Sequence, residues 1–352
     1  MIAATFAAVL AAASASPASS PAPWFAPPTT RVAAQAVTFT NQGATLHGTL
    51  YVPDVGHPVP AIVVFHGASE PLASTLLYRH LSEGLPQIGI AVLLFDRRGA
   101  GKSTGNPDVP YQTLANDGIA GAAAIRQLPQ IDPQRVGYWG ISQGGWLATI
   151  AASSDSRAAF AVAVSAPLVP AETQMEFAMS NRLDVLGYSS KDVAAMLEAR
   201  YQVDGYFNGR NSRAQAVAAL DKIENRPWFD LMYLPTAAEL PKNPANSSWR
   251  GQMDLDSFAA VERVRIPILF LLGSEDPWIP VAATVARLRT VAATHPHLAF
   301  DVVPGANHLM MMPPAHELMN DAEPAQIAAE APQSPAYFML LASWLERIVT
   351  PR

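Results

Sequence analysis

An α/β fold, with a mostly parallel sheet and helices on both of its faces, is predicted by three observations. Uninterrupted apolar runs, such as 61–65 (AIVVF) and 266–272 (IPILFLL), have the length and composition of strands buried on both faces. These runs alternate with segments of helical periodicity. Half of the 352 residues are hydrophobic, so the chain can bury a large core. This alternation is typical of a parallel sheet with helices covering both sides.

The expected elements follow one another along the chain. Two strands, at 37–40 and 45–52, flank a hairpin-like Asn41-Gln42-Gly43 turn. Further buried strands are expected at 61–65, 90–95, 136–139, 160–164, 266–272 and 298–303. Helices are expected at 76–88, 111–128, 144–152, 281–292 and 337–349.

The alternation stops near residue 170 and resumes near 266. Between these points lie two segments with helical spacing, 191–201 and 213–223, and then a stretch rich in aromatic residues. The simplest account is a helical lid at 171–257, inserted into one core formed by 36–170 and 258–352.

Residues 1–35 are expected to be a signal peptide and a flexible spacer. The first 13 residues are apolar and alanine-rich, and a small-x-small sequence at 13–15 resembles a cleavage site. We therefore expect a periplasmic or secreted protein. A cytoplasmic protein is the alternative, because no Lys or Arg precedes the apolar run. That run is too short for a spanning helix, so no stable membrane insertion is expected.

The composition excludes several functions. The absence of cysteine rules out disulfides, thiolate metal sites and a cysteine nucleophile. The net charge of −6 comes without a basic stripe, so nucleic acid is not an expected partner. The oligomeric state is left open by the sequence.

The sharpest motif is G-x-S-x-G, formed by Gly140, Ser142 and Gly144. It stands directly between an expected strand and an apolar helix. A serine on such a tight turn lifts its hydroxyl above the sheet edge, and the helix N-terminus favours the negative charge of acyl transfer. The flanking positions need glycine because side chains there would collide with neighbouring backbone. We interpret Ser142 as a nucleophile.

A nucleophilic serine needs a base and an orienting acid. The strand at 266–272 is followed by Glu275 and Asp276, and the strand at 298–303 is followed by His308. Both positions fall at the carboxyl edge of the sheet, where ligands bind in such folds. Of the eight histidines, His308 stands closest after the last strand, in such a loop, so it is the expected base. Either carboxylate could be the acid.

Two backbone N–H groups are expected to form an oxyanion hole. One belongs to Gln143, next to the nucleophile. The other comes from the turn after 61–65, with Ala68 as first choice and Gly67 as second; His66 is expected to hold this turn. The segment 96–103 (DRRGAGKS) lacks the spacing of a phosphate-binding loop, and we interpret it as a turn in which Asp96 pairs with the arginines.

These motifs identify a family resemblance. From Val37 to the last helix the chain resembles α/β-hydrolases, especially bacterial esterases near the dipeptidyl-peptidase-like and bile-acid-acyltransferase-like groups. The resemblance rests on LHGTL (46–50), HG (66–67), DRRGAGKS (96–103), GISQGG (140–145), GSEDP (273–277) and GANH (305–308). It implies Asp276 as the acid, a lid between strands six and seven, and acyl transfer without a metal or organic cofactor. The HG turn continues Ala-Ser-Glu, so the wide oxyanion loop of the HGGG lipases is absent.

The default substrate is a carboxylic ester with a short or medium acyl chain. Trp228, Phe229 and Tyr233 would suit an apolar acyl pocket, or they form the core of the lid itself. An aminopeptidase is the runner-up, with Glu172 or Glu176 binding a substrate ammonium. Other amide or thioester hydrolases and acyltransferases would use the same triad. A catalytically silent binding protein is the rival of a different class, and the complete triad argues against it.

Overall fold

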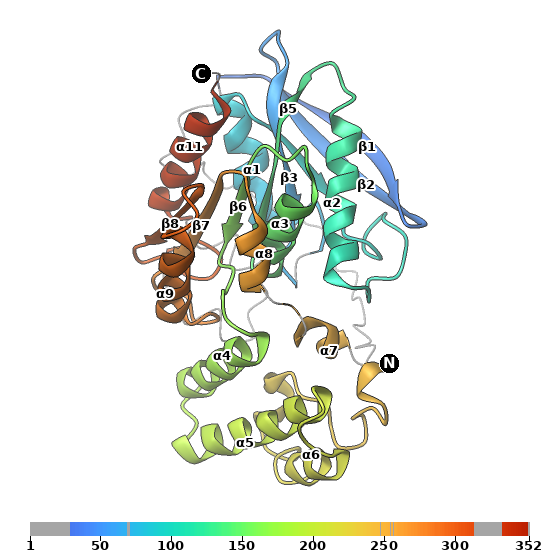
Figure 1. Ribbon diagram of the computed structural model, residues 1–352, viewed down its shortest axis with the longest axis vertical. Helices are drawn as coiled ribbons and strands as arrows, with labels where there is room; N and C mark the ends of the chain where they lie inside the picture. The colour runs from blue at the N-terminus through green and yellow to red at the C-terminus, as the bar shows by residue number, and fades with distance from the viewer. Residues whose placement is uncertain are drawn as a thin grey trace, which may run out of the picture.

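The computed structural model describes residues 29–68, 71–246, 248–253, 255, 257–312 and 333–350 (Figure 1). The apolar segment and cleavage site of the expected signal peptide lie outside these residues. The spacer was expected to reach residue 35, but strand β1 (Val32–Asn41) already begins at Val32, which pairs with Pro53. Pairing along the whole of the neighbouring strand extends an alanine-rich segment whose own sequence has little strand propensity. Among the described helices, none combines the length and apolarity that a membrane crossing needs.

One eight-stranded sheet forms the centre of the molecule, in the order β1-β2-β4-β3-β5-β6-β7-β8. The first two strands are antiparallel to their neighbours, and the six from β4 to β8 run parallel. Besides β1, the strands are β2 (Ala44–Pro53), β3 (Val59–Phe65), β4 (Ala91–Phe95), β5 (Ile131–Ile141), β6 (Ala161–Val164), β7 (Ile268–Gly273) and β8 (Leu298–Val303). The predicted fold class is thus confirmed.

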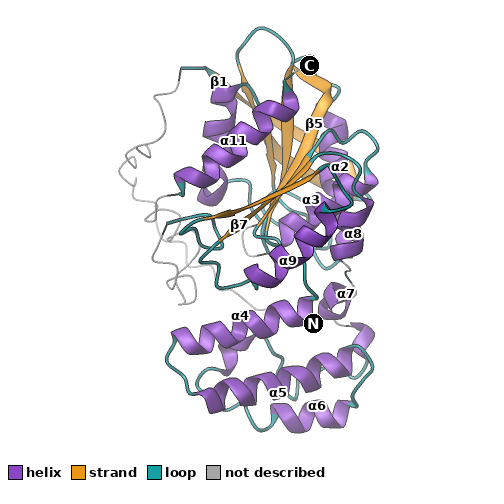
Figure 2. Ribbon diagram, turned by 60° about the vertical axis from the view of Figure 1, so that its left-hand side comes forward, coloured by secondary structure: helices purple, strands orange, loops and turns teal. Residues whose placement is uncertain are grey.

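Helices cover both faces of this sheet (Figure 2). The strand alternation assigns Val63 and Phe65 of β3 to one face, and Ile62 and Val64 to the other. The first face packs against α2 (Tyr111–Ile125), α3 (Gln143–Ser154), α8 (Ser257–Arg263) and α9 (Val281–Ala292). The second packs against η1 (Leu76–Tyr78), α1 (Arg79–Gly84), η2 (Leu85–Ile88) and α11 (Pro335–Val349).

The single helix expected at 76–88 is broken into these three short pieces. Pro86 lies inside the segment and cannot donate an i→i−4 hydrogen bond, and Gly89 ends it with a φ of +80°.

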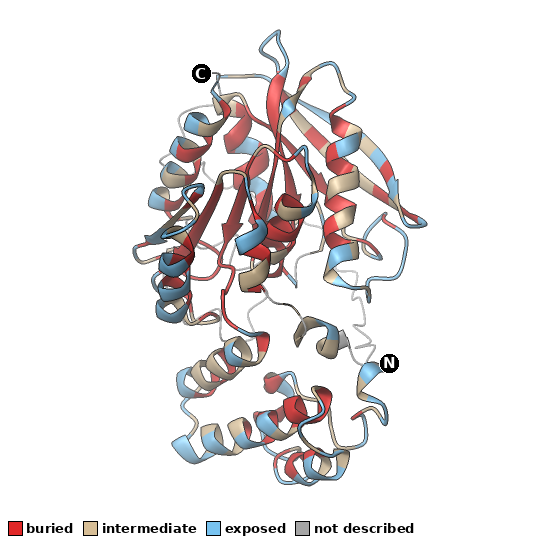
Figure 3. Cartoon of the chain, in the orientation of Figure 1, coloured by how far each residue is buried: buried red, intermediate tan, exposed pale blue. Residues whose placement is uncertain are grey.

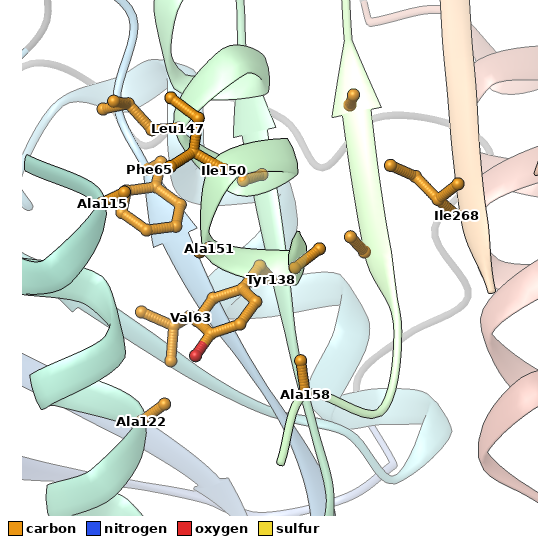
Figure 4. Packing of buried hydrophobic residues seen from close by; sticks show 14 of the residues in the cluster. Val63, Phe65, Ala115, Ala122, Tyr138, Leu147, Ile150, Ala151, Ala158 and Ile268 are labelled. Carbon is orange, nitrogen blue, oxygen red and sulfur yellow. The ribbon is translucent and has the colours of Figure 1, made fainter. Parts of the chain in front are cut away.

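Helix α2 approaches the sheet unusually closely. A Cβ at Gly118 would come within 2.1 Å of the Phe65 ring. The Phe65 ring, in turn, packs against Tyr138 of β5 with a centroid distance of 5.8 Å (Figure 4). This packing fixes the ends of β3 and β5, which are the strands that carry the HG turn and Ser142.

A helical insertion, residues 171–253, separates β6 from β7. It contains α4 (Ala171–Val185), α5 (Ser190–Phe207), α6 (Arg213–Leu220), η3 (Phe229–Met232), η4 (Pro244–Asn246) and α7 (Ser248–Met253). Its helices bury their inner faces against each other and expose their outer faces (Figure 3). The insertion therefore has a core of its own, separate from the two cores beside the sheet.

The insertion docks on the sheet domain through polar contacts of α4. Gln174 Nε2 donates to the carbonyl of Trp278 at 2.9 Å, and Asn181 Nδ2 donates to the carbonyl of Pro277 at 3.1 Å. Both carbonyls belong to the loop that follows β7.

Candidate functional site

Ser142 occupies a strained turn between β5 and α3. Its φ is +55° and its ψ is −121°, a conformation that costs a non-glycine residue free energy. The turn is possible only with glycine on both sides. A Cβ at Gly140 would lie 1.9 Å from the Gly144 carbonyl oxygen, and one at Gly144 would lie 2.3 Å from the Phe65 oxygen. The G-x-S-x-G spacing thus produces the strand-turn-helix context that the sequence predicts.

His308 and Asp276 are joined by a hydrogen bond. His308 Nδ1 lies 2.8 Å from Asp276 Oδ2, and both residues are buried. Because the carboxylate can only accept, Nδ1 carries the proton and Nε2 is the basic atom. The other carboxylate oxygen, Oδ1, accepts from the N–H groups of Trp278 at 2.8 Å and Ile279 at 3.2 Å. The acid is therefore held by the backbone on one side and holds the imidazole on the other.

The loops that carry these two residues are tied together. The Glu275 N–H donates to the Ala306 carbonyl at 3.0 Å, and a Cβ at Gly273 would come within 2.3 Å of the same oxygen. Glu275 itself is exposed, and its carboxylate accepts from Ser274 at 3.1 Å. The residues alone left both Glu275 and Asp276 open as the acid. In the structure, Asp276 is the one that is hydrogen-bonded to His308.

The two expected oxyanion segments lie close together. The contact of Gly144 with the Phe65 oxygen brings the start of α3 against the end of β3. The Gly67 N–H donates to the Tyr78 hydroxyl at 3.0 Å, so it is not available to a substrate oxygen. Within the described residues the Ala68 N–H donates to no group. This difference favours Ala68 over Gly67.

His66 is buried behind the HG turn. Its Nε2 donates to the carbonyl of Phe95, and its ring lies 4.7 Å from that of Tyr78. Burial lowers the pKa of His66 to about 4, so the ring is neutral at pH 7. These contacts fit the expected role of holding the turn.

The pairing expected within 96–103 is wrong for one arginine. Arg98 forms a buried ion pair with Asp117 of α2 at 2.6 Å, rather than with Asp96. Asp96 accepts from the N–H groups of Ala73 at 3.0 Å and Lys102 at 2.9 Å. The sequence offered no signal for Asp117, which lies in a helix 19 residues away.

The three aromatic residues of the insertion occupy different environments. Trp228 has no exposed surface and Phe229 is 4% exposed, and both pack within the core of the insertion. We therefore assign these two to that core rather than to a substrate pocket. Tyr233 is 64% exposed, and its ring lies 6.3 Å from that of Trp278. The Trp278 ring is in turn 6.4 Å from His308.

The rings of Tyr233, Trp278 and His308 therefore lie in a row from the insertion to the sheet domain. Trp278 was not predicted as a site residue, although it stands only two residues after Asp276.

Of the two acidic residues of the peptidase alternative, Glu172 is already paired within the insertion. Glu172 accepts from Arg210 at 2.8 Å and from Asn208 at 2.9 Å. Glu176 is half-buried, and its charge acts on Arg200. Burial lowers the pKa of Arg200, and Asp204 and Glu176 oppose that shift.

Comparison with known proteins supports the same fold. A model of the alpha/beta hydrolase family matches residues 62–322. A thiohydrolase of Aspergillus aculeatus is 32% identical over 163 residues, which are 46% of this chain and 48% of that protein. A polyketide transferase of Aspergillus fumigatus is 23% identical over 305 residues, covering 86% of this chain and 87% of that protein. The chain thus matches about half the length of the thiohydrolase and most of the transferase.

Solved structures show the same architecture at low sequence identity. An esterase of Pyrococcus furiosus has a TM-score of 0.55 and 15% identity, covering 91% of this chain and 92% of that one. An α/β hydrolase of Penicillium has a TM-score of 0.55 and 19% identity, covering 90% and 99%. At such identities these likenesses concern the fold alone. The family match spans most of the chain, and the chain therefore belongs to the alpha/beta hydrolase family.

Proposed function

We propose that the protein is a serine hydrolase that cleaves carboxylic esters with short or medium acyl chains. The observation that carries the proposal is the hydrogen-bonded Asp276–His308 pair, placed at the sheet edge where Ser142 stands in its strained turn. In parallel strands β5, β7 and β8 the carboxyl ends share one edge, so the three residues follow strands that end on the same side.

The proposed reaction has two steps. Ser142 Oγ attacks the ester carbonyl carbon while His308 Nε2 takes its proton, and collapse of the tetrahedral intermediate expels the alcohol, protonated by His308. Water then attacks the acyl-enzyme by the same route. Asp276 keeps the imidazole in the tautomer with a basic Nε2 and stabilises its cationic form. The N–H groups of Gln143 and Ala68 stabilise the oxyanion.

Thioesters are the second candidate substrates. Relatives named as a thiohydrolase and a polyketide transferase favour them, and the same nucleophile would attack either carbonyl. The aminopeptidase alternative loses support, because Glu172 is paired with Arg210.

The test is hydrolysis of a small panel by wild type and Ser142→Ala. The panel holds p-nitrophenyl esters of increasing chain length, acyl thioesters of N-acetylcysteamine and aminoacyl p-nitroanilides. We expect ester turnover that falls by about 10⁴-fold or more in the variant. Equal turnover by the two proteins would overturn the triad. A strong preference for thioesters would show that thioesters, not esters, are the substrates. Turnover of the anilides alone would support the aminopeptidase hypothesis instead.

A further inference from the structure

One guanidinium, that of Arg97, contacts both segments of the proposed oxyanion hole. Its Nη2 donates to Oε1 of Gln143. Its Nη1 lies 3.4 Å from the Gly67 carbonyl oxygen and 3.5 Å from that of Ala68. Arg97 follows β4, which pairs with β3. From this position the side chain spans from the turn after β3 to the first residue of α3.

The contact with Gly67 bears on the orientation of an N–H group. The Gly67 carbonyl and the Ala68 N–H belong to one planar, trans peptide unit, so they point in opposite directions. A donor fixed on the carbonyl therefore directs the N–H to the other side. The cation also polarises the unit and makes its N–H a better donor. The preceding peptide unit is fixed as well, because the Gly67 N–H is bound by Tyr78.

The contact with Gln143 holds the other donor residue. The Gln143 amide is held at both ends, since its Nε2 donates to the Tyr111 hydroxyl at 2.9 Å while its Oε1 accepts from Arg97. Gln143 is buried at the N-terminus of α3. A tether shared with Gly67 therefore fixes the distance between the two proposed N–H donors.

We propose that Arg97 is a positioning residue that sets the spacing and polarity of the oxyanion hole without touching the substrate. This inference rests on the proposed chemistry of Ser142. Mispositioned donors weaken an interaction that is strongest in the transition state, so kcat should suffer more than KM. The role differs from the one predicted for this segment, in which the arginines only pair with Asp96.

The experiment compares wild type with Arg97→Met, Arg97→Lys and Tyr111→Phe. We would measure kcat, KM, the melting temperature and the inhibition constant of an alkyl trifluoromethyl ketone. In that adduct Ser142 Oγ bonds to the ketone carbon, the carbonyl oxygen takes the electron pair, and His308 takes the proton. The adduct therefore reports on oxyanion stabilisation directly.

For Arg97→Met we expect kcat to fall by about 10- to 100-fold, less than or similar to the loss of one oxyanion donor, with KM within about three-fold. The inhibition constant should rise in parallel with the fall in kcat/KM. Arg97→Lys should recover only part of this, because an ammonium lacks the fork that bridges two acceptors. Tyr111→Phe removes one hydroxyl, so it tests the Gln143 contact even where Arg97→Met fails to fold.

Arg79→Gln is the control. This exposed arginine pairs with Glu83 at 2.6 Å in α1, and its removal should leave kcat, KM and the inhibition constant unchanged. The role of Arg97 is overturned if folded Arg97→Met and Tyr111→Phe keep wild-type kcat and ketone inhibition, or lose only thermal stability. Fluorophosphonate labelling of wild type separates the two proposals. An unlabelled Ser142 contradicts the proposed function, whereas labelled wild type with insensitive variants contradicts the role of Arg97 alone.

Discussion

At the scale of single residues, Asp276 uses its two carboxylate oxygens for different partners. Oδ1 accepts from two backbone N–H groups, and Oδ2 accepts from His308. In Asp276→Asn the amide oxygen can keep the backbone contacts, which leaves the amide NH₂ facing His308. Nδ1 must then accept, so the proton moves to Nε2 and the base is lost.

We therefore expect Asp276→Asn to lower kcat by about 10³- to 10⁴-fold while the fold is retained. Steady-state kinetics with the best ester of the panel, together with circular dichroism, checks this. Glu275→Gln is the matched control, since that exposed carboxylate does not contact His308. A normal kcat in Asp276→Asn would remove Asp276 from the mechanism.

Gly144 allows a second prediction at this scale. A Cβ there would lie 2.3 Å from the Phe65 oxygen and 2.7 Å from the His66 oxygen, and backbone cannot yield as a flexible side chain does. Gly144→Ala should destabilise the protein by about 1–3 kcal/mol, the usual range for overpacking, and abolish fluorophosphonate labelling. Gly251→Ala in α7 meets no atom within 4 Å and should keep both properties. Denaturant unfolding and gel-based labelling give the answer.

At the scale of elements, the strands were easier to predict from the sequence than the insertion. The helix at 281–292 and the strand at 298–303 were predicted with the bounds of α9 and β8. Helix α4 was missed. Its buried positions include Arg182 beside Ala178 and Met179, and polar Gln174 and Asn181 face the loop after β7. A helix that docks through amides has no simple apolar stripe to recognise.

The candidate site also has a part that the sequence predicts and a part that only the structure reveals. Chain order and strand ends predicted that the loops of Ser142 and His308 lie on one edge of the sheet, and the parallel strands β5 and β8 place them there. The contacts of Arg97 with Gln143 and of Trp278 with Tyr233 join segments far apart in sequence. No spacing rule could reveal those contacts.

The contact between Tyr233 and Trp278 gives a prediction for the residue that follows η3. Tyr233 lies next to Trp278, and Arg182 lies 6.0 Å from its ring centre on the insertion side. Tyr233→Ala should raise KM for medium-chain esters by about five-fold, in line with roughly 1 kcal/mol for an aromatic contact, and leave acetate esters unchanged. Tyr201→Ala is the matched control, since that exposed tyrosine of α5 contacts Arg210 instead. Chain-length profiles of both variants test the idea, and identical profiles would refute it.

At the scale of the whole molecule, His80 of α1 links two helices that are far apart in sequence and cover the same face of the sheet, α1 and α11. Its Nδ1 donates to the Leu77 carbonyl at 2.8 Å, and its Nε2 lies 3.1 Å from the hydroxyl of Tyr337 in α11. Burial lowers the pKa of His80 to about 4, from 6.5. Between pH 6.5 and 4 the unfolded chain therefore takes up a proton that the folded chain does not.

The free energy of unfolding should thus fall as the pH drops through this window, with His80 contributing about 1 kcal/mol per pH unit. Urea titrations at several pH values from 7 to 4 measure the slope. His80→Gln should flatten it by that amount, whereas the exposed His57→Gln should keep the wild-type slope. An unchanged slope in His80→Gln would show that His80 does not contribute.

The amide contacts of α4 have a consequence for engineering. Gln174 and Asn181 bind the carbonyls of Trp278 and Pro277, the residues that immediately follow Asp276. The insertion therefore cannot be exchanged without affecting the loop that carries Asp276. A chimera that carries the corresponding segment of another hydrolase must supply hydrogen-bond donors for these two carbonyls. Without them, the loop that carries Asp276 loses two of the hydrogen bonds that hold it in place.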